Sequence, residues 1–113
     1  MSLKESKCEA CTIDAPLVSD SEVKVLLLEL DGWVIESDSG INQLIKTYKF
    51  SNYAESLDFS NKVADLAESE DHHPKIVLEY GSVEVSWWSH KIKGLHKNDF
   101  ICAAKTDRLF PHT

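Results

Sequence analysis

The chain has 113 residues, of which 42 % are hydrophobic and 27 % are charged, a composition typical of one globular domain. Its 12 Lys and Arg are scattered among 19 Asp and Glu, and the formal net charge of −7 argues against a protein that binds nucleic acid through a basic patch. The longest run of strongly apolar residues, 25–28, is too short to span a bilayer, and the first residues lack the apolar core of a secretory signal. We therefore expect a cytoplasmic protein with no direct nucleic-acid or membrane partner.

Residues 1–18 differ from the rest of the chain because they show no hydrophobic periodicity and contain a proline. We interpret them as a loosely held arm before a single domain over residues 19–113. The arm carries a Cys-x-x-Cys pair, Cys8 and Cys11, but a structural zinc site usually needs a second pair, and a redox pair usually lies in a βαβ unit. Reduced thiols are the simpler interpretation, and Cys102 is expected to pack as a small hydrophobe.

The first expected element is a helix that begins after Ser19. Ser19 and Glu22 fit a capping box, in which each side chain caps a backbone amide of the other residue. The apolar residues that follow at helical spacing are Val23, Leu26, Leu27 and Leu30. The Asp31-Gly32 pair is expected to end this helix.

Two strands and a second helix are expected next. A short strand over 33–37 and a longer strand over 41–50, rich in β-branched and aromatic residues, flank a turn over 37–40. Ser51-Asn52 can then cap a helix that runs to about residue 69. Its expected apolar side is supplied by Leu57, Ala64 and one face that carries Phe59, Val63, Leu66 and Ala67.

The pattern of the last third of the chain predicts a hairpin and a helix. Pro74 disfavours helical geometry at the residue before it, so the second helix must end earlier. A hairpin over 75–90 and a connector over 91–97 should follow. Asn98 or a neighbour is expected to cap the last helix, with Asp99 in its first turn, where a carboxylate is favourable.

The predicted order is helix, two strands, helix, two strands, helix. Two hairpins favour one four-stranded antiparallel sheet, and a sheet of this size needs its apolar face covered. We therefore predict an α+β fold in which three helices cover one face of the sheet.

The hairpin has a predicted register. If Gly81 and Ser82 form a two-residue loop, Tyr80 faces Val83, and His73 lies opposite His90. One face would then carry a continuous apolar surface made of Ile76, Leu78, Tyr80, Val83, Val85 and Trp87. The other face would be mixed polar and aromatic, with Val77, Glu79, Glu84, Ser86, Trp88 and His90. A different loop length would change this pairing.

His72, His73 and His90 are the candidate functional residues, beside three carboxylates, Glu68, Asp71 and Asp99. The charge of imidazole changes near neutral pH, which suits proton transfer. The plainest alternative is that the histidines are surface residues at a strand edge.

Two other kinds of site remain as alternatives. A three-histidine metal site is disfavoured because adjacent residues of an extended chain, such as His72 and His73, point to opposite faces. A hydrolytic nucleophile at Ser86 or Ser89 is disfavoured because nothing like a nucleophile elbow surrounds either serine.

These residues also form a known pattern. The run Glu68-x-x-x-His72-His73-Pro74, followed at fixed spacing by Tyr80, His90 and Asp99, resembles the signature of the pterin-4a-carbinolamine dehydratases. Gly32-Trp33 and the stretch 87–95 also look like this family, and the resemblance covers roughly residues 19–108. The Cys-x-x-Cys arm is similar to that of bacterial members associated with phenylalanine hydroxylation.

The resemblance implies loss of water from a 4a-hydroxytetrahydropterin substrate to give quinonoid dihydropterin. This reaction regenerates the pterin cofactor of aromatic amino acid hydroxylases, which links the chain functionally to phenylalanine hydroxylase. It needs no metal and no organic cofactor of its own. The resemblance also implies a homodimer or homotetramer.

By the same resemblance, His72 and His90 are the acid and base candidates, in an order that the sequence leaves open, and His73 is a pterin-binding or auxiliary acid group. Glu68 and Asp71 are expected to orient histidines or bind the pterin. Asp99 can hold His90 or can simply favour the start of a helix. Trp33 can wall the pocket or belong to the core.

A protein-binding module is the alternative function. Members of the family can also serve as dimerisation cofactors or accessory proteins, in which case the histidines would be dispensable. Three imidazoles and three carboxylates in one place favour the enzyme, because binding alone does not require them.

Overall fold

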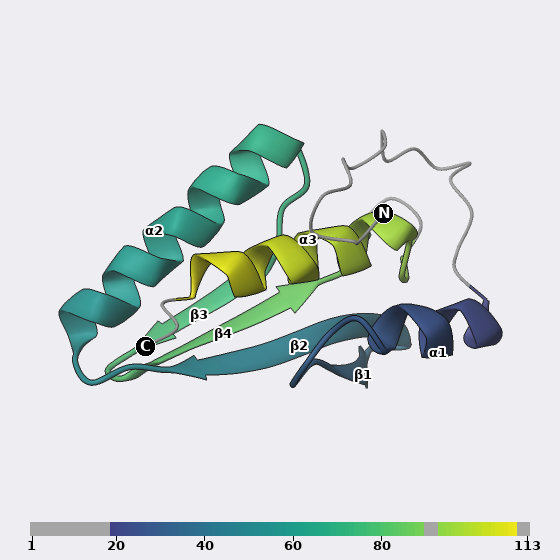
Figure 1. Cartoon of the computed structure of the whole chain (residues 1–113), viewed down its shortest axis with the longest axis horizontal. Coiled ribbons are helices and arrows are strands. Elements are labelled where there is room, and N and C mark those ends of the chain that lie inside the picture. Colours follow the sequence, from purple (N-terminus) through teal and green to yellow (C-terminus); the bar gives the residue numbers. More distant parts are fainter. Residues whose placement is uncertain (1–18, 90–92, 111–113) are drawn as a thin grey trace.

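The computed structural model describes residues 19–89 and 93–110. The elements are α1 (Asp20–Leu27), β1 (Val34–Asp38), β2 (Ile41–Lys49), α2 (Tyr53–Glu70), β3 (Lys75–Glu79), β4 (Ser82–Trp87) and α3 (Lys97–Leu109). The strands form one antiparallel sheet in the order β1-β2-β4-β3. The predicted α+β fold and order of elements are therefore confirmed (Figure 1).

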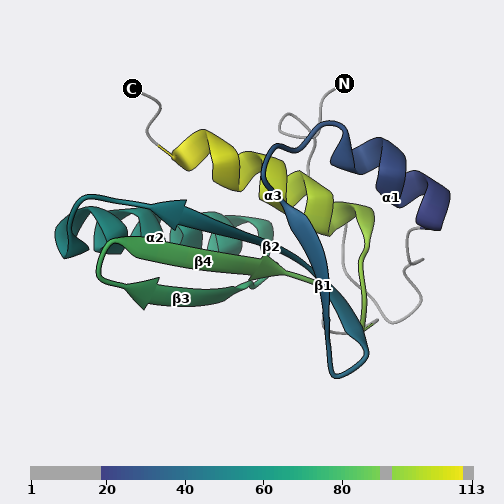
Figure 2. The same ribbon diagram turned by 90° about the horizontal axis from the view of Figure 1, so that it is seen from below.

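The helices α2 and α3 form a layer against the sheet. α2 contacts β3 and β4, and α3 contacts β4 and β2, so α3 crosses the central pair of strands (Figures 1 and 2). α1 lies near the start of α3. Val83, Val85 and Trp87 of β4 are fully buried under these helices. Burial of such apolar side chains stabilises the fold by roughly 25 cal/mol per Å².

The helix starts follow their capping residues. The Ser19 hydroxyl accepts from the Glu22 amide at 3.2 Å, and the Ser19 amide donates to Glu22 Oε1 at 3.1 Å, which confirms the predicted capping box. Asn52 caps α2 as expected, with its Oδ1 accepting from the Glu55 amide at 2.9 Å. The α1 helix itself ends at Leu27, earlier than the predicted Asp31-Gly32 stop.

The cap of α3 lies two residues before Asn98. It is His96, whose Nδ1 accepts from the Asn98 amide at 3.0 Å, while the Asp99 carboxylate accepts from the His96 amide. Histidine is not among the usual capping residues, but its unprotonated ring nitrogen is an acceptor. Asp99 lies in the first turn, as predicted.

The predicted register of the β3–β4 hairpin was wrong by two residues. Leu78 pairs with Val83 and Glu79 with Ser82, so the loop is Tyr80-Gly81. Gly81 takes the second loop position because the backbone there has a φ of +76°, which favours glycine. Its carbonyl also accepts from the Phe50 amide at 2.9 Å.

A shift of two residues leaves each side chain on its predicted face. Tyr80, however, lies in the loop and is 75 % exposed, so it does not extend the apolar face. The predicted pairing of His73 with His90 loses its basis, since β3 begins only at Lys75. His90 itself lies outside the described residues.

Replacement of Gly81 tests the turn. A Cβ at Gly81 would meet the Phe50 carbonyl at 3.2 Å, whereas a Cβ at Gly40, which has a similar φ of +81°, would meet nothing within 4 Å. Both Gly→Ala changes should lose about 1–2 kcal/mol from the positive φ, and we expect Gly81→Ala to lose measurably more. Urea unfolding of the two variants measures the difference. Equal losses would contradict a steric role for the Phe50 carbonyl.

Candidate active site

The end of α2 sets the direction of His72. Asp71 adopts a left-handed conformation with φ 51° and ψ 43°, and its amide bonds back to the last turn of the helix. The His72 amide also bonds to the Ala67 carbonyl, at 3.1 Å. This tight helix end turns the His72 side chain inward, where it is 5 % exposed, while the side chain of Asp71 stays at the surface.

A buried carboxylate, Asp99, receives His72. Asp99 Oδ1 lies 2.6 Å from His72 Nε2, and its Oδ2 accepts from the Ser89 hydroxyl at 2.9 Å and from the His96 amide at 2.8 Å. Asp99 and Ser89 have no exposed surface, and His96 is 4 % exposed. The hydrogen bonds and the N-terminus of α3 offset the cost of burying this charge.

The contact with Asp99 constrains the tautomer of His72. If Asp99 is ionised, its carboxylate only accepts hydrogen bonds, and the bond then requires the proton on His72 Nε2. Nδ1 is then the ring nitrogen that can gain or lose a proton without breaking this bond. The ring stacks on Trp87, with centroids 5.5 Å apart and planes 9° apart, which fixes its orientation.

His73 lies in a different environment from His72. Its Nε2 is 2.7 Å from Glu68 Oε1, and the two side chains are 55 % and 80 % exposed. Adjacent residues 72 and 73 thus point in opposite directions, one into the protein and one to solvent. An exposed pair of this kind contributes little to stability but can hold an imidazole in place.

Some of the expected site residues lie together. His72 contacts Asp99 and His73 contacts Glu68 in the described part of the chain. The histidine that contacts Asp99 in the described part of the chain is His72. The sequence suggested His90 for this role, and His90 lies outside the described residues. Two residues of this site were missed: His96, although its spacing to Asp99 is that of a capping box, and the donor role of Ser89.

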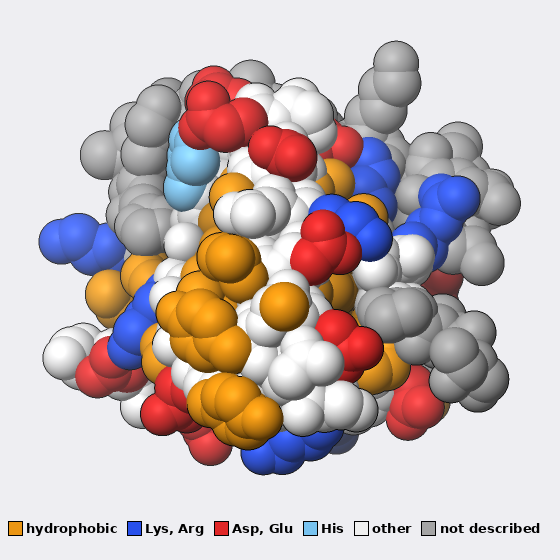
Figure 3. Space-filling view, turned by 90° about the vertical axis from the view of Figure 1, so that its left-hand side faces the viewer, with side chains coloured by type: hydrophobic (Ala, Val, Ile, Leu, Met, Phe, Trp, Pro, Cys, Tyr) orange, Lys and Arg blue, Asp and Glu red, His pale blue; other side chains and the backbone are white. Residues whose placement is uncertain are grey.

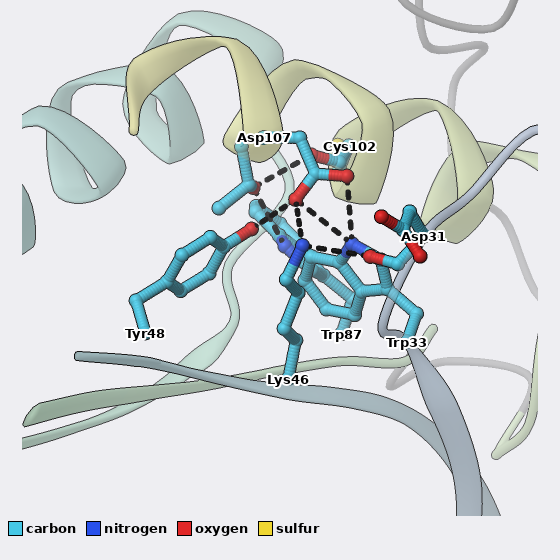
Figure 4. A network of polar contacts seen from close by, with 8 residues as sticks. Asp31, Trp33, Lys46, Tyr48, Trp87, Cys102 and Asp107 are labelled. Carbon is cyan, nitrogen blue, oxygen red and sulfur yellow. Dashed lines mark hydrogen bonds and ion pairs between the residues drawn. The ribbon is translucent and has the colours of Figure 1, made fainter. Parts of the chain in front are cut away.

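Trp33 lies elsewhere, in a second polar network around Asp107 (Figure 4). The Trp33 Nε1 donates to the Asp107 carboxylate at 3.1 Å, and the Lys46 ammonium donates to the same carboxylate at 2.9 Å. The Tyr48 hydroxyl donates to the same carboxylate. Asp107 follows Asp99 by eight residues on α3, so the two carboxylates are separated by roughly 12 Å along the helix axis. Trp33, 6 % exposed, is a core residue here.

In residues 19–89 and 93–110, no group of three or more His, Cys, Asp or Glu side chains is placed to hold a metal ion. In the same ranges no helix has the length and apolar character needed to cross a bilayer. Cys102 is buried in the hydrophobic core, as its apolar neighbours predicted.

A comparison with protein families identifies the family of the chain. The profile of the family described as Pterin 4 alpha carbinolamine dehydratase matches residues 16–109. The chain belongs to this family. The match spans all seven elements and includes both halves of the His72–Asp99 pair.

Two bacterial relatives of this dehydratase family member match over almost their whole length. A Vibrio vulnificus protein is 59 % identical over 107 residues, covering 95 % of this chain and 97 % of its own. A Saccharophagus degradans protein is 56 % identical over 108 residues, covering 96 % of each. Both carry the name "Putative pterin-4-alpha-carbinolamine dehydratase".

Solved structures share the fold of this dehydratase family member. A transcriptional coactivator/pterin dehydratase from Brucella melitensis superposes with a TM-score of 0.74 at 28 % identity, over 83 % of this chain and 98 % of that one. A pterin dehydratase-like RuBisCO assembly factor of the alpha-carboxysome superposes with a TM-score of 0.59 at 22 % identity, over 71 % and 90 %. The second likeness concerns the fold alone.

The Asp107 network makes the free energy of unfolding depend on pH in the alkaline range. Burial, together with the hydrogen bond to Asp107, raises the pKa of the Tyr48 phenol well above its ordinary value. Because this pKa is higher in the folded chain, the neutral phenol stabilises the fold below about pH 10, and that contribution is lost as the pH rises further.

We expect the free energy of unfolding to fall between pH 9 and pH 11, and to fall less in Tyr48→Phe. Urea unfolding at the two pH values measures this. Tyr80→Phe, at an exposed position, is the matched control and should behave like the wild type. An equal fall in Tyr48→Phe and the wild type would contradict the assignment.

Proposed function

We propose that the protein dehydrates 4a-hydroxytetrahydropterin to quinonoid dihydropterin by histidine acid and base catalysis. The buried pair of His72 and Asp99 carries this proposal, since it gives one imidazole a fixed orientation and a defined protonated nitrogen. Membership of the dehydratase family supplies the substrate class.

The chemistry requires two proton transfers. A general acid protonates the hydroxyl on C4a, the C4a–O bond breaks with assistance from the N5 lone pair, and the hydroxyl leaves as water. A base then removes the N5 proton, so that C4a=N5 remains. The base has now gained a proton and the acid has lost one, and proton exchange with water returns both groups to their starting states. General acid and base groups of this kind contribute about 10²–10⁴-fold to the rate.

We assign the acid and base roles to His72 and His90, and an auxiliary or pterin-binding role to His73. His72 would exchange its proton at Nδ1, because Nε2 is held by Asp99. His73, exposed and held by Glu68, is suited to meet a substrate that arrives from solvent. Asp71 and Glu68 lie at the end of α2 that leads into this region, where they can orient the pterin.

The proposed setting is the recycling of the pterin cofactor of an aromatic amino acid hydroxylase in the cytoplasm, by a homodimer or homotetramer. The product, quinonoid dihydropterin, is one reduction away from the tetrahydropterin that such a hydroxylase consumes. Sedimentation of the purified protein distinguishes dimer from tetramer.

His72→Gln should lower the enzymatic acceleration about 10²–10⁴-fold, because a proton-transfer group is lost. The decay of the 4a-hydroxy intermediate is followed while tetrahydropterin cycles through phenylalanine hydroxylase at limiting pterin, with wild type, His72→Gln and His90→Gln. Lys62→Gln, on the exposed side of α2, is the control and should match the wild type. No acceleration by the wild type would refute the proposed function, and an active His72→Gln would refute the role of His72.

Protein binding is a second candidate, favoured by two observations. The Brucella melitensis protein is described as a coactivator as well as a dehydratase. Hydrophobic side chains also gather on the face where α2 begins and the β3–β4 turn lies (Figure 3), and the exposed ones include Tyr53, Leu57 and Tyr80. A stoichiometric complex with purified phenylalanine hydroxylase that survives in the His72→Ala, His90→Ala double variant would support it. If neither the wild type nor the double variant forms a complex with the hydroxylase, the result would count against protein binding.

A further inference from the structure

Ser89 has a buried hydroxyl that the proposed chemistry does not use. The residue follows β4 and has no exposed surface. Its backbone is fixed by a bridge to Gly94, with the Ser89 amide donating to the Gly94 carbonyl at 2.8 Å and the reverse bond at 3.4 Å. The side chain therefore presents its hydroxyl from a rigid point to Asp99.

The hydroxyl determines how the Asp99 carboxylate is oriented. Ser89 Oγ and the His96 amide both donate to Oδ2, at 2.9 and 2.8 Å, from separate segments of the chain. Two donors on Oδ2 fix the plane of the carboxylate and leave Oδ1 directed at His72 Nε2, 2.6 Å away. Without the Ser89 hydroxyl, Oδ2 would keep one of these two donors, the His96 amide, and the plane of the carboxylate would be less restricted.

The plane of the His72 ring has an independent support. Trp87 stacks on it, and the Trp87 indole nitrogen donates to the Thr106 hydroxyl at 3.1 Å, which in turn donates to the Cys102 carbonyl at 2.7 Å. Trp87 thus restricts tilting of the ring, whereas the Asp99 carboxylate is the described group that bonds to a ring nitrogen and so restricts which nitrogen carries the proton. Ser89 acts on the position of the proton, through its hydrogen bond to the carboxylate.

We propose that Ser89 is a positioning residue: by holding Asp99 Oδ2, its hydroxyl fixes the Nε2–H tautomer of His72, so that His72 exchanges protons through Nδ1. The catalytic consequence rests on the proposed dehydration, whereas the tautomer itself does not. This role also accounts for a buried serine close to histidines without any hydrolytic chemistry, since the hydroxyl proton is donated to a carboxylate.

The test compares Ser89→Ala with Ser89→Thr, which restores a hydroxyl. Ser86→Ala is the matched control, because Ser86 is also buried, at 3 % exposure, and is not among the described donors to Asp99. Two quantities are measured: the exchange rate of the His72 Nε2 proton by nuclear magnetic resonance, assigned by its loss in His72→Gln, and kcat and KM for the dehydration. Thermal unfolding shows that each variant is folded.

We expect Ser89→Ala to exchange the Nε2 proton at least about tenfold faster and to lower kcat about 10- to 100-fold, the range of a hydrogen bond to a charged group, with KM changed less than about twofold. Ser89→Thr should recover both quantities, and Ser86→Ala should match the wild type. Loss of substrate binding alone would raise KM instead.

Unchanged proton exchange in Ser89→Ala would overturn the positioning role, whatever the activity. Faster exchange with unchanged kcat would overturn its catalytic importance. If the wild type does not accelerate the dehydration at all, the proposed function fails separately, and the exchange rate of the Nε2 proton still decides whether Ser89 fixes the tautomer. If Ser89→Thr does not fold, the comparison of Ser89→Ala with Ser86→Ala remains decisive.

Discussion

The buried carboxylate of Asp99 is the interaction on which the site depends. A charge with no exposed surface is tolerated only when hydrogen bonds and local dipoles compensate for its lost hydration. Its donors come from three separate parts of the chain: the turn after α2, the segment after β4 and the start of α3. The three segments must converge for the carboxylate to be stable, so the fold and the site are specified by the same contacts.

α3 carries a polar anchor near each end. Asp99 in its first turn joins the helix to α2 and β4, and Asp107 in its last turn joins it to the side chains of Trp33, Lys46 and Tyr48. Between the anchors, Phe100, Ile101 and Ala103 are buried in the core. Apolar burial supplies most of the stability of such a helix, while the two carboxylates fix its rotation and its position along the sheet.

The sequence was sufficient to predict the features of the fold that depend on local rules. Capping at Ser19 and Asn52, helical periodicity and alternation along β4 predicted the elements and the faces of the sheet. The hairpin register was missed because two adjacent residues, Gly81 and Ser82, both favour turns, and only the positive φ at the second loop position separates the two choices. A two-residue error preserves each face, which is why the apolar face of β3 and β4 was predicted correctly except at Tyr80, which lies in the loop.

The contact between His72 and Asp99 could not be predicted from local sequence rules. Residues 72 and 99 are brought together by the packing of α3 across β4, and no periodicity relates them. The cap at His96 was missed for a different reason, since an imidazole acceptor is chemically able to cap but is seldom used. Resemblance to a family identified Asp99 as important, yet its role depends on where α3 begins.

Neighbouring histidines with unlike surroundings lie at the end of α2. The left-handed residue Asp71 ends α2 one position before His72, so His72 turns into the core and His73 turns to solvent. One imidazole thereby has a buried carboxylate partner, and the other remains open to solvent. The proposed roles follow this difference, since the buried His72 would transfer protons together with His90, while the exposed His73 would meet the pterin as it arrives from solvent.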